Sequence, residues 1–247
     1  MSITQEIINK CREIIDKKCV SKNKFQSLIG SLMYIHKCIR SSRMFTNRLL
    51  ENLRNAKGRF ISINEEIIRD VKWFLEFIPK FNGSATYVHE PPFKAHTIEI
   101  DASLHRVGGV WGNQVYTVKI PDFVKCDASI THFEMINILV ALQVWKQAWT
   151  HKYIEFYVDN QAVVSICNTG YTRDSILATY MRNIWLLTSV YDIRIAVKHI
   201  AGKKNNIADL LSRWEDNSPS HISKLSQLVQ YKWQKVSDEF FKVNVNI

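Results

Sequence analysis

Four acidic residues in the second half of the chain stand where their carboxylates could be directed to one place. Asp101 and Asp159 follow strand-like runs, and Glu134 and Asp209 lie in the first turn of helix-like runs. Carboxylate oxygens are the ligands that Mg²⁺ and Mn²⁺ prefer, and two such ions about 3.5–4 Å apart can hydrolyse a phosphodiester. The set therefore predicts a metal-dependent nuclease.

Three of these acids also have a structural explanation. Thr131 and Glu134 have the Thr-x-x-Glu spacing of a helix capping box. Asp209 lies where a negative charge favours the start of a helix, and Asp159 followed by Asn160 could end a strand and open a turn. These alternatives stay open at the level of sequence.

The pattern after residue 95 predicts the elements that would position the four acids. Strands are expected over residues 97–101, 108–111, 115–120, 153–159 and 193–197, and helices over 131–150, 161–168, 174–189 and from Asn205 or Asn206 to about Trp214. This order predicts an α/β fold with a mixed five-stranded sheet flanked by helices. Asp101 and Asp159 converge if the strands that they follow are neighbours.

The first 82 residues predict a small helical module. Apolar residues recur at three- and four-residue steps over residues 3–18, from Ser21 onward, over 42–55 and after Asn64, where the helix must end before Pro79. Turn signals at 81–84 and 90–92 separate this module from an α/β domain over 95–215. Residues 216–247 are expected to be a linker and a tail.

The net charge of +10 is concentrated in one stretch. Residues 17–59 hold eleven Lys or Arg and one acid, and the rest of the chain holds 22 residues of each sign. A local block predicts a polyanionic partner such as nucleic acid, although a solvated basic helix face is the alternative. The residues expected to contact nucleic acid are Lys37, Arg40, Arg43, Arg48 and Arg54.

Composition argues against several other classes of protein. The five cysteines are odd in number and scattered and form no Cys-x-x-Cys pair, which argues against a disulfide framework and a zinc site and fits a reducing compartment. The chain has no signal-peptide pattern and no run of ~18 apolar residues. We therefore expect an intracellular protein, in cytoplasm or nucleus, that is neither secreted nor membrane-spanning.

The order of the four acids resembles that of type 1 ribonuclease H domains, over about residues 98–213. In that family an Asp closes the first strand, a Glu lies on the first helix, an Asp closes the fourth strand and an Asp opens the last helix, as Asp101, Glu134, Asp159 and Asp209 do here. The resemblance implies that they ligate two Mg²⁺ or Mn²⁺ ions. His199 matches the family's loop histidine, which assists water delivery or product release; it could equally be a polar strand-end residue.

Several segments are similar to retroelement proteins in particular. Ile-Asp-Ala-Ser at 100–103, Val-Asp-Asn at 158–160 and residues 199–213 resemble retroelement ribonuclease H domains. Residues 26–38 and 74–83 resemble the region joining polymerase to ribonuclease H in tyrosine-recombinase (DIRS-like) retrotransposons. The resemblance covers roughly residues 20–215 and implies cleavage of the RNA strand of RNA–DNA hybrids, within or as a fragment of a reverse transcriptase polyprotein. The polymerase portion would be a further partner.

The chain departs from the family pattern in one respect that bears on substrate binding. About 50 residues separate Asp159 from Asp209, too few for the extra basic helix that many family members use to hold the hybrid. The basic stretch 17–59 would then supply that affinity. Two alternatives remain: a catalytically inactive nucleic-acid-binding remnant, and a connector that docks on a polymerase through Trp73, Phe74 and Phe77, aromatics that would otherwise form core.

Overall fold

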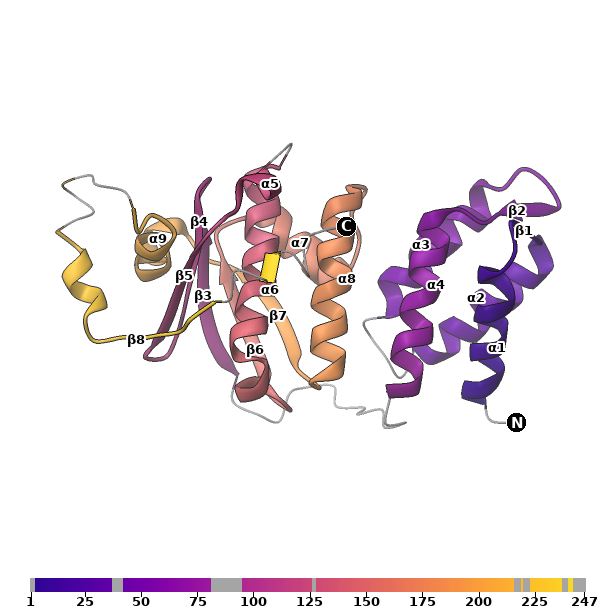
Figure 1. Cartoon of the computed structure of the whole chain (residues 1–247), viewed down its shortest axis with the longest axis horizontal. Helices are drawn as coiled ribbons and strands as arrows, with labels where there is room; N and C mark the ends of the chain where they lie inside the picture. Colours follow the sequence, from indigo (N-terminus) through magenta and orange to yellow (C-terminus); the bar gives the residue numbers. More distant parts are fainter. Residues whose placement is uncertain are drawn as a thin grey trace. The chain divides into compact units, whose positions relative to one another are not determined.

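The computed structural model describes residues 3–36, 42–80, 95–125, 128–215, 219, 223–236 and 240–241. The chain divides into two compact units, Met1–His89 and Glu90–Ile247 (Figure 1).

The first unit is helical, with a short two-stranded ribbon. Its helices are α1 (Ile3–Ile15), α2 (Lys22–His36), α3 (Ser42–Asn55) and α4 (Glu65–Phe77), followed by the 3-10 turn η1 (Ile78–Lys80). As predicted, Asn64 caps α4, since its side chain accepts a hydrogen bond from the Ile67 amide. Strands β1 (Cys19–Ser21) and β2 (Phe60–Ser62) pair antiparallel. They were not predicted, because three residues are too few to show a strand period.

A cluster of aromatic side chains lies in the core of this unit. Trp73 stacks on Phe45 at 4.0 Å between ring centroids and on Phe77 at 5.0 Å. Phe74 is fully buried beside them. These rings are therefore core residues, which removes the basis for a docking surface made of Trp73, Phe74 and Phe77.

The second unit contains a six-stranded mixed sheet in the order β7-β6-β3-β4-β5-β8. The strands are β3 (His96–Ala102), β4 (Arg106–Trp111), β5 (Gln114–Lys119), β6 (Tyr153–Val158), β7 (Arg194–His199) and β8 (Lys232–Trp233). Strands β3, β4 and β5 form an antiparallel meander, and β6 and β7 run parallel to β3. The predicted α/β fold, a mixed sheet flanked by helices, is confirmed, with six strands where five were expected.

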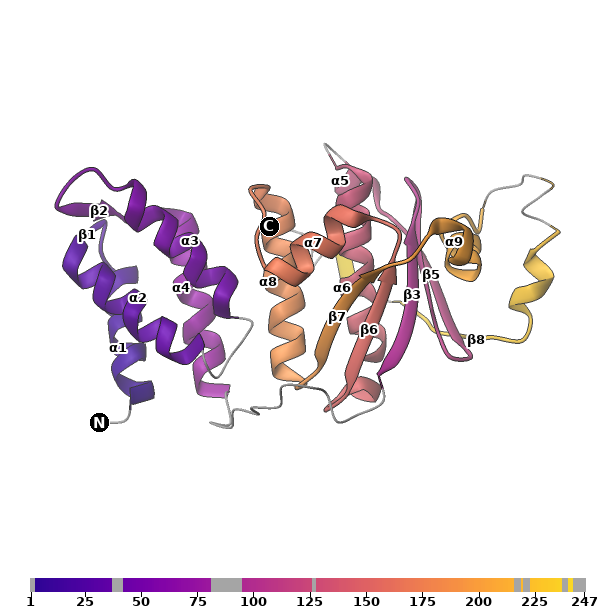
Figure 2. The ribbon, with the colours of Figure 1, turned by 180° about the vertical axis from the view of Figure 1, so that it is seen from behind.

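Helices cover both faces of this sheet. Helices α6 (Ile130–Trp149), α7 (Gln161–Thr169) and α8 (Ser175–Val190) lie on one face and α9 (Asn206–Ser212) on the other (Figures 1 and 2). The remaining short elements are α5 (Asp122–Lys125), η2 (Gly202–Lys204) and η3 (Leu225–Leu228).

Two adjacent glycines in β4 allow both helical layers to approach closely. A Cβ on Gly108 would lie 2.8 Å from the carbonyl carbon of Leu211 in α9, and a Cβ on Gly109 would lie 2.7 Å from the Tyr116 ring. That ring packs against Trp145 of α6. Since successive residues of a strand face opposite sides, Gly108 lets α9 contact the sheet backbone directly, and Gly109 leaves room for the Tyr116 ring on the other face.

The sixth strand comes from the segment that we expected to be a linker and tail. β8 pairs parallel with β5, and the Trp233 ring lies against Trp214 with centroids 4.8 Å apart. Leu228 is buried in a cluster with Val115, Leu210 and Leu211. This segment therefore covers the β5 edge, which would otherwise present unpaired backbone groups.

Among the helices that the structure describes, none combines the length and the hydropathy that a bilayer crossing requires.

Candidate metal centre and nucleic-acid surface

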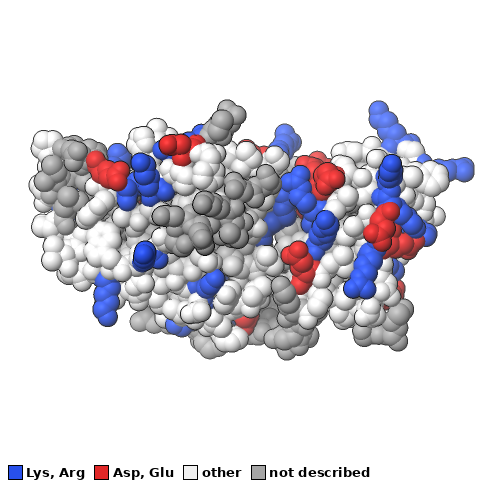
Figure 3. Space-filling model, viewed as in Figure 1, with Lys and Arg blue, Asp and Glu red and all other residues white. Residues whose placement is uncertain are grey.

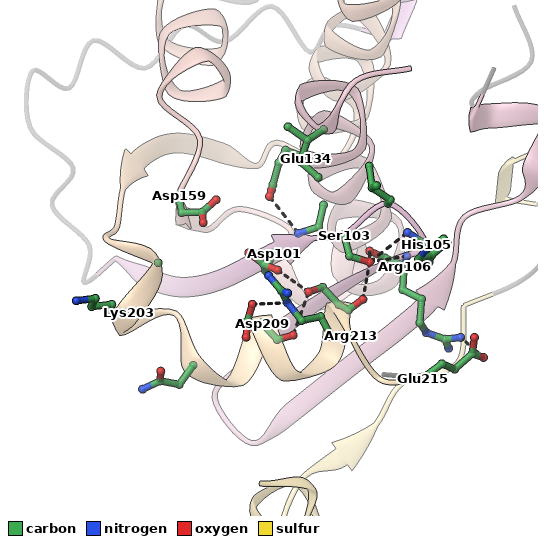
Figure 4. A pocket seen from close by; sticks show the side chains of 16 residues that line it. Asp101, Ser103, His105, Arg106, Glu134, Asp159, Lys203, Asp209, Arg213 and Glu215 are labelled. Atoms are coloured by element: carbon green, nitrogen blue, oxygen red, sulfur yellow. Dashed lines mark hydrogen bonds and ion pairs between the residues drawn. The ribbon is translucent and has the colours of Figure 1, made fainter. Parts of the chain in front are cut away.

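Three of the four predicted acids converge at the carboxyl ends of β3 and β6. Ligand oxygens of Asp101, Glu134 and Asp159 all lie within 4.8 Å of one another (Figure 4). The cause is topological: β3 and β6 are parallel neighbours with Glu99 opposite Tyr157, so the residues that follow them meet at one sheet edge. Helix α6 adds Glu134 from one face of the sheet.

Glu134 is buried, and among the described residues only one of its two carboxylate oxygens has a hydrogen-bond partner. The side chain is 1% exposed; Oε1 accepts a hydrogen bond from the Ala102 amide at 3.0 Å, and Oε2 has no partner among the described residues. The capping-box explanation for Glu134 is wrong, because Ser129 and His132 form that box instead. Burial, and then the neighbouring carboxylates, raise the pKa of Glu134 well above its usual range.

Asp159 follows the last residue of β6, and the capping contact at this turn is made by Asn160. Asn160 caps α7, because its side-chain oxygen accepts hydrogen bonds from the Ala162 and Val163 amides, and its amide donates to the Thr131 hydroxyl. The neighbouring asparagine therefore opens the turn, and the exposed Asp159 carboxylate is left to face the cluster.

Asp101 is held from α9 by a residue that the sequence did not single out. The Asp101 side chain is 6% exposed, and the buried Ser212 hydroxyl donates a hydrogen bond to its Oδ2. Burial raises the pKa of Asp101 to about 7; the Ser212 hydrogen bond and the charge of Arg213 oppose the rise, and Asp159 and Asp209 add to it.

A buried asparagine fixes the backbone beneath this carboxylate. The Asn137 amide donates to the carbonyl oxygens of Asp101 and Gly108 at 2.7 and 2.9 Å. The side-chain oxygen of Asn137 accepts a hydrogen bond from the Tyr116 hydroxyl. An asparagine among the apolar residues of α6 is the signal by which it could have been found, since buried polar groups need partners.

The fourth predicted acid, Asp209, is engaged differently. It lines the same pocket, but it is not one of the three carboxylates that meet within 4.8 Å. Its Oδ1 accepts a hydrogen bond from Arg213 Nε at 2.8 Å, an ion pair between neighbouring turns of α9. The structure therefore places three predicted ligands together and the fourth beside them, paired with a cation.

His199 is the last residue of β7, with Val158 opposite it in β6. It is exposed, and the described residues that line the pocket do not include it. Its position is that of a polar strand-end residue near Asp159, and its catalytic role stays a prediction.

The carboxylates open into a pocket of about 1070 Å³. Three Lys or Arg residues line it: Arg106, Lys203 and Arg213. Arg106 pairs with Glu215. The full lining is Asp101, Ala102, Ser103, Leu104, His105, Arg106, Ile130, Glu134, Asp159, Gly202, Lys203, Asn206, Asp209, Ser212, Arg213 and Glu215.

The donor set fits a hard divalent cation. All of the converging side-chain donors are carboxylate oxygens, the ligand class that Mg²⁺ and Mn²⁺ prefer. A buried carboxylate oxygen without a hydrogen bond is costly, and the unpaired Glu134 Oε2 is such an atom. A cation bound by these residues would supply the missing partner.

The structure describes only some of the side chains that were predicted to contact nucleic acid. Lys37, Arg40 and the side chain of Arg43 lie outside the described residues. Arg48 makes two hydrogen bonds, of 2.6 and 2.8 Å, to the carboxylate of Asp70, which is 2% exposed. Arg48 therefore holds a buried acid inside the unit, whatever else it binds.

Within the basic stretch 17–59, several exposed basic residues that pair with no described acid lie next to β1 and β2. Lys17 and Lys24 both pair with Glu13, so their charges are offset. Four other basic residues of the stretch are exposed and form no ion pair with a described residue: Lys18, Arg54, Lys57 and Arg59. Figure 3 shows Lys and Arg side chains projecting at this end of the unit. We call these four residues the ribbon-end surface.

The fold and the site define an α/β domain with an acidic, metal-compatible pocket at the carboxyl ends of two parallel strands. A family model described as "Reverse transcriptase-like" matches residues 113–215. This range contains Glu134, Asp159, His199 and Asp209, and Asp101 lies before it. No curated protein is detectably similar in sequence to the chain.

Solved structures with a similar fold include a cellular enzyme and viral proteins. RNase H1 from the halophilic archaeon Halobacterium salinarum NRC-1 is 18% identical, with a TM-score of 0.39 over 51% of this chain and 100% of that one. A foamy viral protease-reverse transcriptase in complex with RNA/DNA hybrid is 14% identical, with a TM-score of 0.31 over 80% of this chain and 27% of that one. A complex of the viral protein with dsDNA is 15% identical, with a TM-score of 0.33 and coverage of 80% and 41%. The chain thus spans less than half the length of these viral chains.

Proposed function

We propose that this chain is a ribonuclease H that hydrolyses the RNA strand of RNA–DNA hybrids with two Mg²⁺ or Mn²⁺ ions. The observation that carries the proposal is the convergence of Asp101, Glu134 and Asp159 within 4.8 Å. The match of residues 113–215 to a reverse transcriptase-like family model supports the same class of protein.

Each acid would have a distinct part in holding the ions. Glu134 offers its unpaired Oε2 from α6, and Asp101 and Asp159 offer oxygens from the ends of two strands. Asp209 would complete the second position after leaving Arg213. When bound, the ions supply an activated water and stabilise the leaving oxygen. His199 would assist water delivery or product release from the end of β7.

We propose that the first unit supplies part of the affinity for the hybrid. The hybrid would be recognised through its shape, phosphates and 2′-hydroxyl groups, with the ribbon-end surface contacting phosphates. RNA/DNA hybrid and dsDNA are the ligands named for the foamy viral proteins. The chain would work within, or as a fragment of, a DIRS-like reverse transcriptase polyprotein, with the polymerase portion as partner. An intracellular setting stays a prediction from the scattered cysteines.

The test is cleavage of a labelled hybrid by the purified chain in Mg²⁺ or Mn²⁺. We expect the RNA strand of the hybrid to be cut, double-stranded DNA to remain intact, and EDTA or Asp101→Asn to abolish cleavage. Asp122→Asn is the matched control, because Asp122 is exposed and pairs with nearby Lys125. Failure of the wild-type chain to cut, or equal cutting by the Asp101→Asn variant, would contradict the proposal.

One observation favours the alternative of an inactive nucleic-acid-binding remnant: Asp209 is paired with Arg213 and is not among the three converging acids. Such a protein would bind duplexes without needing a metal. Its log affinity would fall by about 0.9 per phosphate contact for each tenfold rise in salt. Binding of this kind without cleavage in the same assay would establish the alternative.

A further inference from the structure

Two consecutive residues at the end of α9 contact two different carboxylates of the candidate site. The Ser212 hydroxyl donates a hydrogen bond to Asp101 Oδ2, and Arg213 Nε donates to Asp209 Oδ1. Figure 4 shows Arg213 beside Asp209, with Asp101 next to them. The end of one short helix thus fixes half of the predicted ligand set.

The two contacts have opposite consequences for the site. Ser212 is fully buried and holds Asp101 in place beside Glu134 and Asp159, within the 4.8 Å cluster. Arg213 holds Asp209, which stays outside that cluster. The side chains of Arg213 and Asp209 are 54% and 43% exposed, so this pair can separate without opening the core.

We propose that Arg213 is a positioning residue that keeps Asp209 apart from the other three acids and thereby makes the two ion positions unequal. This inference rests on the proposed function. One position, formed by Asp101, Glu134 and Asp159, is preformed in the fold. The other requires Asp209 to exchange its arginine partner for a cation.

The strength of the pair decides whether Arg213 blocks the second position or only weakens it. Exposed ion pairs between neighbouring turns of a helix contribute little net free energy, while two charges on a divalent ion attract a carboxylate more strongly than one. Arg213 should therefore weaken the second position without abolishing it. Removing the arginine charge should strengthen the second position by about fivefold, which corresponds to about 1 kcal/mol.

The experiment is a titration of the full chain with Mn²⁺ at pH 8. Binding is measured by isothermal calorimetry and by the electron paramagnetic resonance signal of free Mn²⁺. We expect the wild type to bind one ion more tightly than a second. Arg213→Gln should tighten the second event about fivefold and leave the first within about twofold, and Arg213→Lys should stay near the wild type. Arg106→Gln is the matched control, because Arg106 lines the same pocket but pairs with Glu215.

A double-mutant cycle tests the assignment to Asp209. Asp209→Asn should weaken the second binding event, and Arg213→Gln should then have no further effect if the two residues act as a pair. The inference would be overturned if the wild type bound two ions with equal affinity. It would also be overturned if Arg213→Gln unfolded normally on heating and left the second binding event unchanged. Either result would leave the proposed nuclease intact. A wild-type chain that binds no Mn²⁺ would overturn both.

Discussion

Replacing Asp101 by asparagine should stabilise the metal-free protein at alkaline pH. The pKa of Asp101 is raised to about 7, mainly by burial, so the folded protein binds this proton more tightly than the unfolded chain does. The sign follows from linkage: the ionised carboxylate destabilises the fold progressively as pH rises from about 4 to about 7 and fully above that range. Asparagine has no such charge and can still accept the Ser212 hydrogen bond.

The magnitude follows from the size of the pKa change. A rise from 3.8 to about 7, at about 1.4 kcal/mol for each pKa unit, gives an upper limit of roughly 4 kcal/mol. The new amide must also find hydrogen-bond partners, and we expect about 2 kcal/mol to remain. For a unit of this size, that gain raises Tm by roughly 4–8 °C.

The assay is differential scanning calorimetry of the full chain at pH 8 and pH 5, in EDTA and in excess Mg²⁺. In EDTA at pH 8, the Tm of the Asp101→Asn variant should be higher than that of the wild type. At pH 5 this difference in Tm should be much smaller. Mg²⁺ should raise the wild-type Tm, because a ligand that binds only the folded state stabilises it, and it should raise the variant's less. Asp122→Asn should not stabilise, since Lys125 lowers the pKa of the exposed Asp122.

Two results would refute this reasoning. The first is a lower Tm for Asp101→Asn than for the wild type at pH 8 in EDTA, which would mean that the carboxylate stabilises the metal-free fold. The second is an equal gain at pH 5 and pH 8, which would mean that ionisation is not the cause.

Three further predictions follow from other contacts. Gly108→Ala should cost about 1–3 kcal/mol of stability by overpacking and reduce hybrid cleavage, because α9 must move away from β4; unchanged cleavage would show that α9 need not sit so close. Arg48→Met should destabilise the first unit by about 2–4 kcal/mol in urea unfolding, because it removes two charged hydrogen bonds to the buried Asp70 carboxylate; a loss under 1 kcal/mol would contradict this. Arg59→Gln should lower the salt dependence of hybrid binding by about one unit of slope, whereas Lys17→Gln, whose charge Glu13 already offsets, should not; equal effects would remove the case for the ribbon-end surface.

The sequence predicted the elements whose apolar pattern repeats over several turns or strand positions. It missed β1, β2 and β8, which have two or three residues each and owe their existence to pairing with distant segments. It also could not show that Arg48 pairs with Asp70, because a count of charges contains no information about partners 22 residues away. The contacts of Ser212 and Arg213 could not be predicted for the same reason. Both residues belong to the segment 199–213, whose sequence resembles retroelement ribonuclease H domains.

Neighbouring residues make the local capping contacts that could have explained Glu134 and Asp159. Ser129 and His132 form the capping box that Glu134 could have formed, and Asn160 opens the turn that Asp159 could have opened. Glu134 in particular bears a cost of burial and of repulsion from the neighbouring carboxylates, and it makes no capping contact in compensation. A bound cation would offset that cost. Asp209 is different, because its contact with Arg213 gives it a structural partner, and its part in the site therefore depends on breaking that contact.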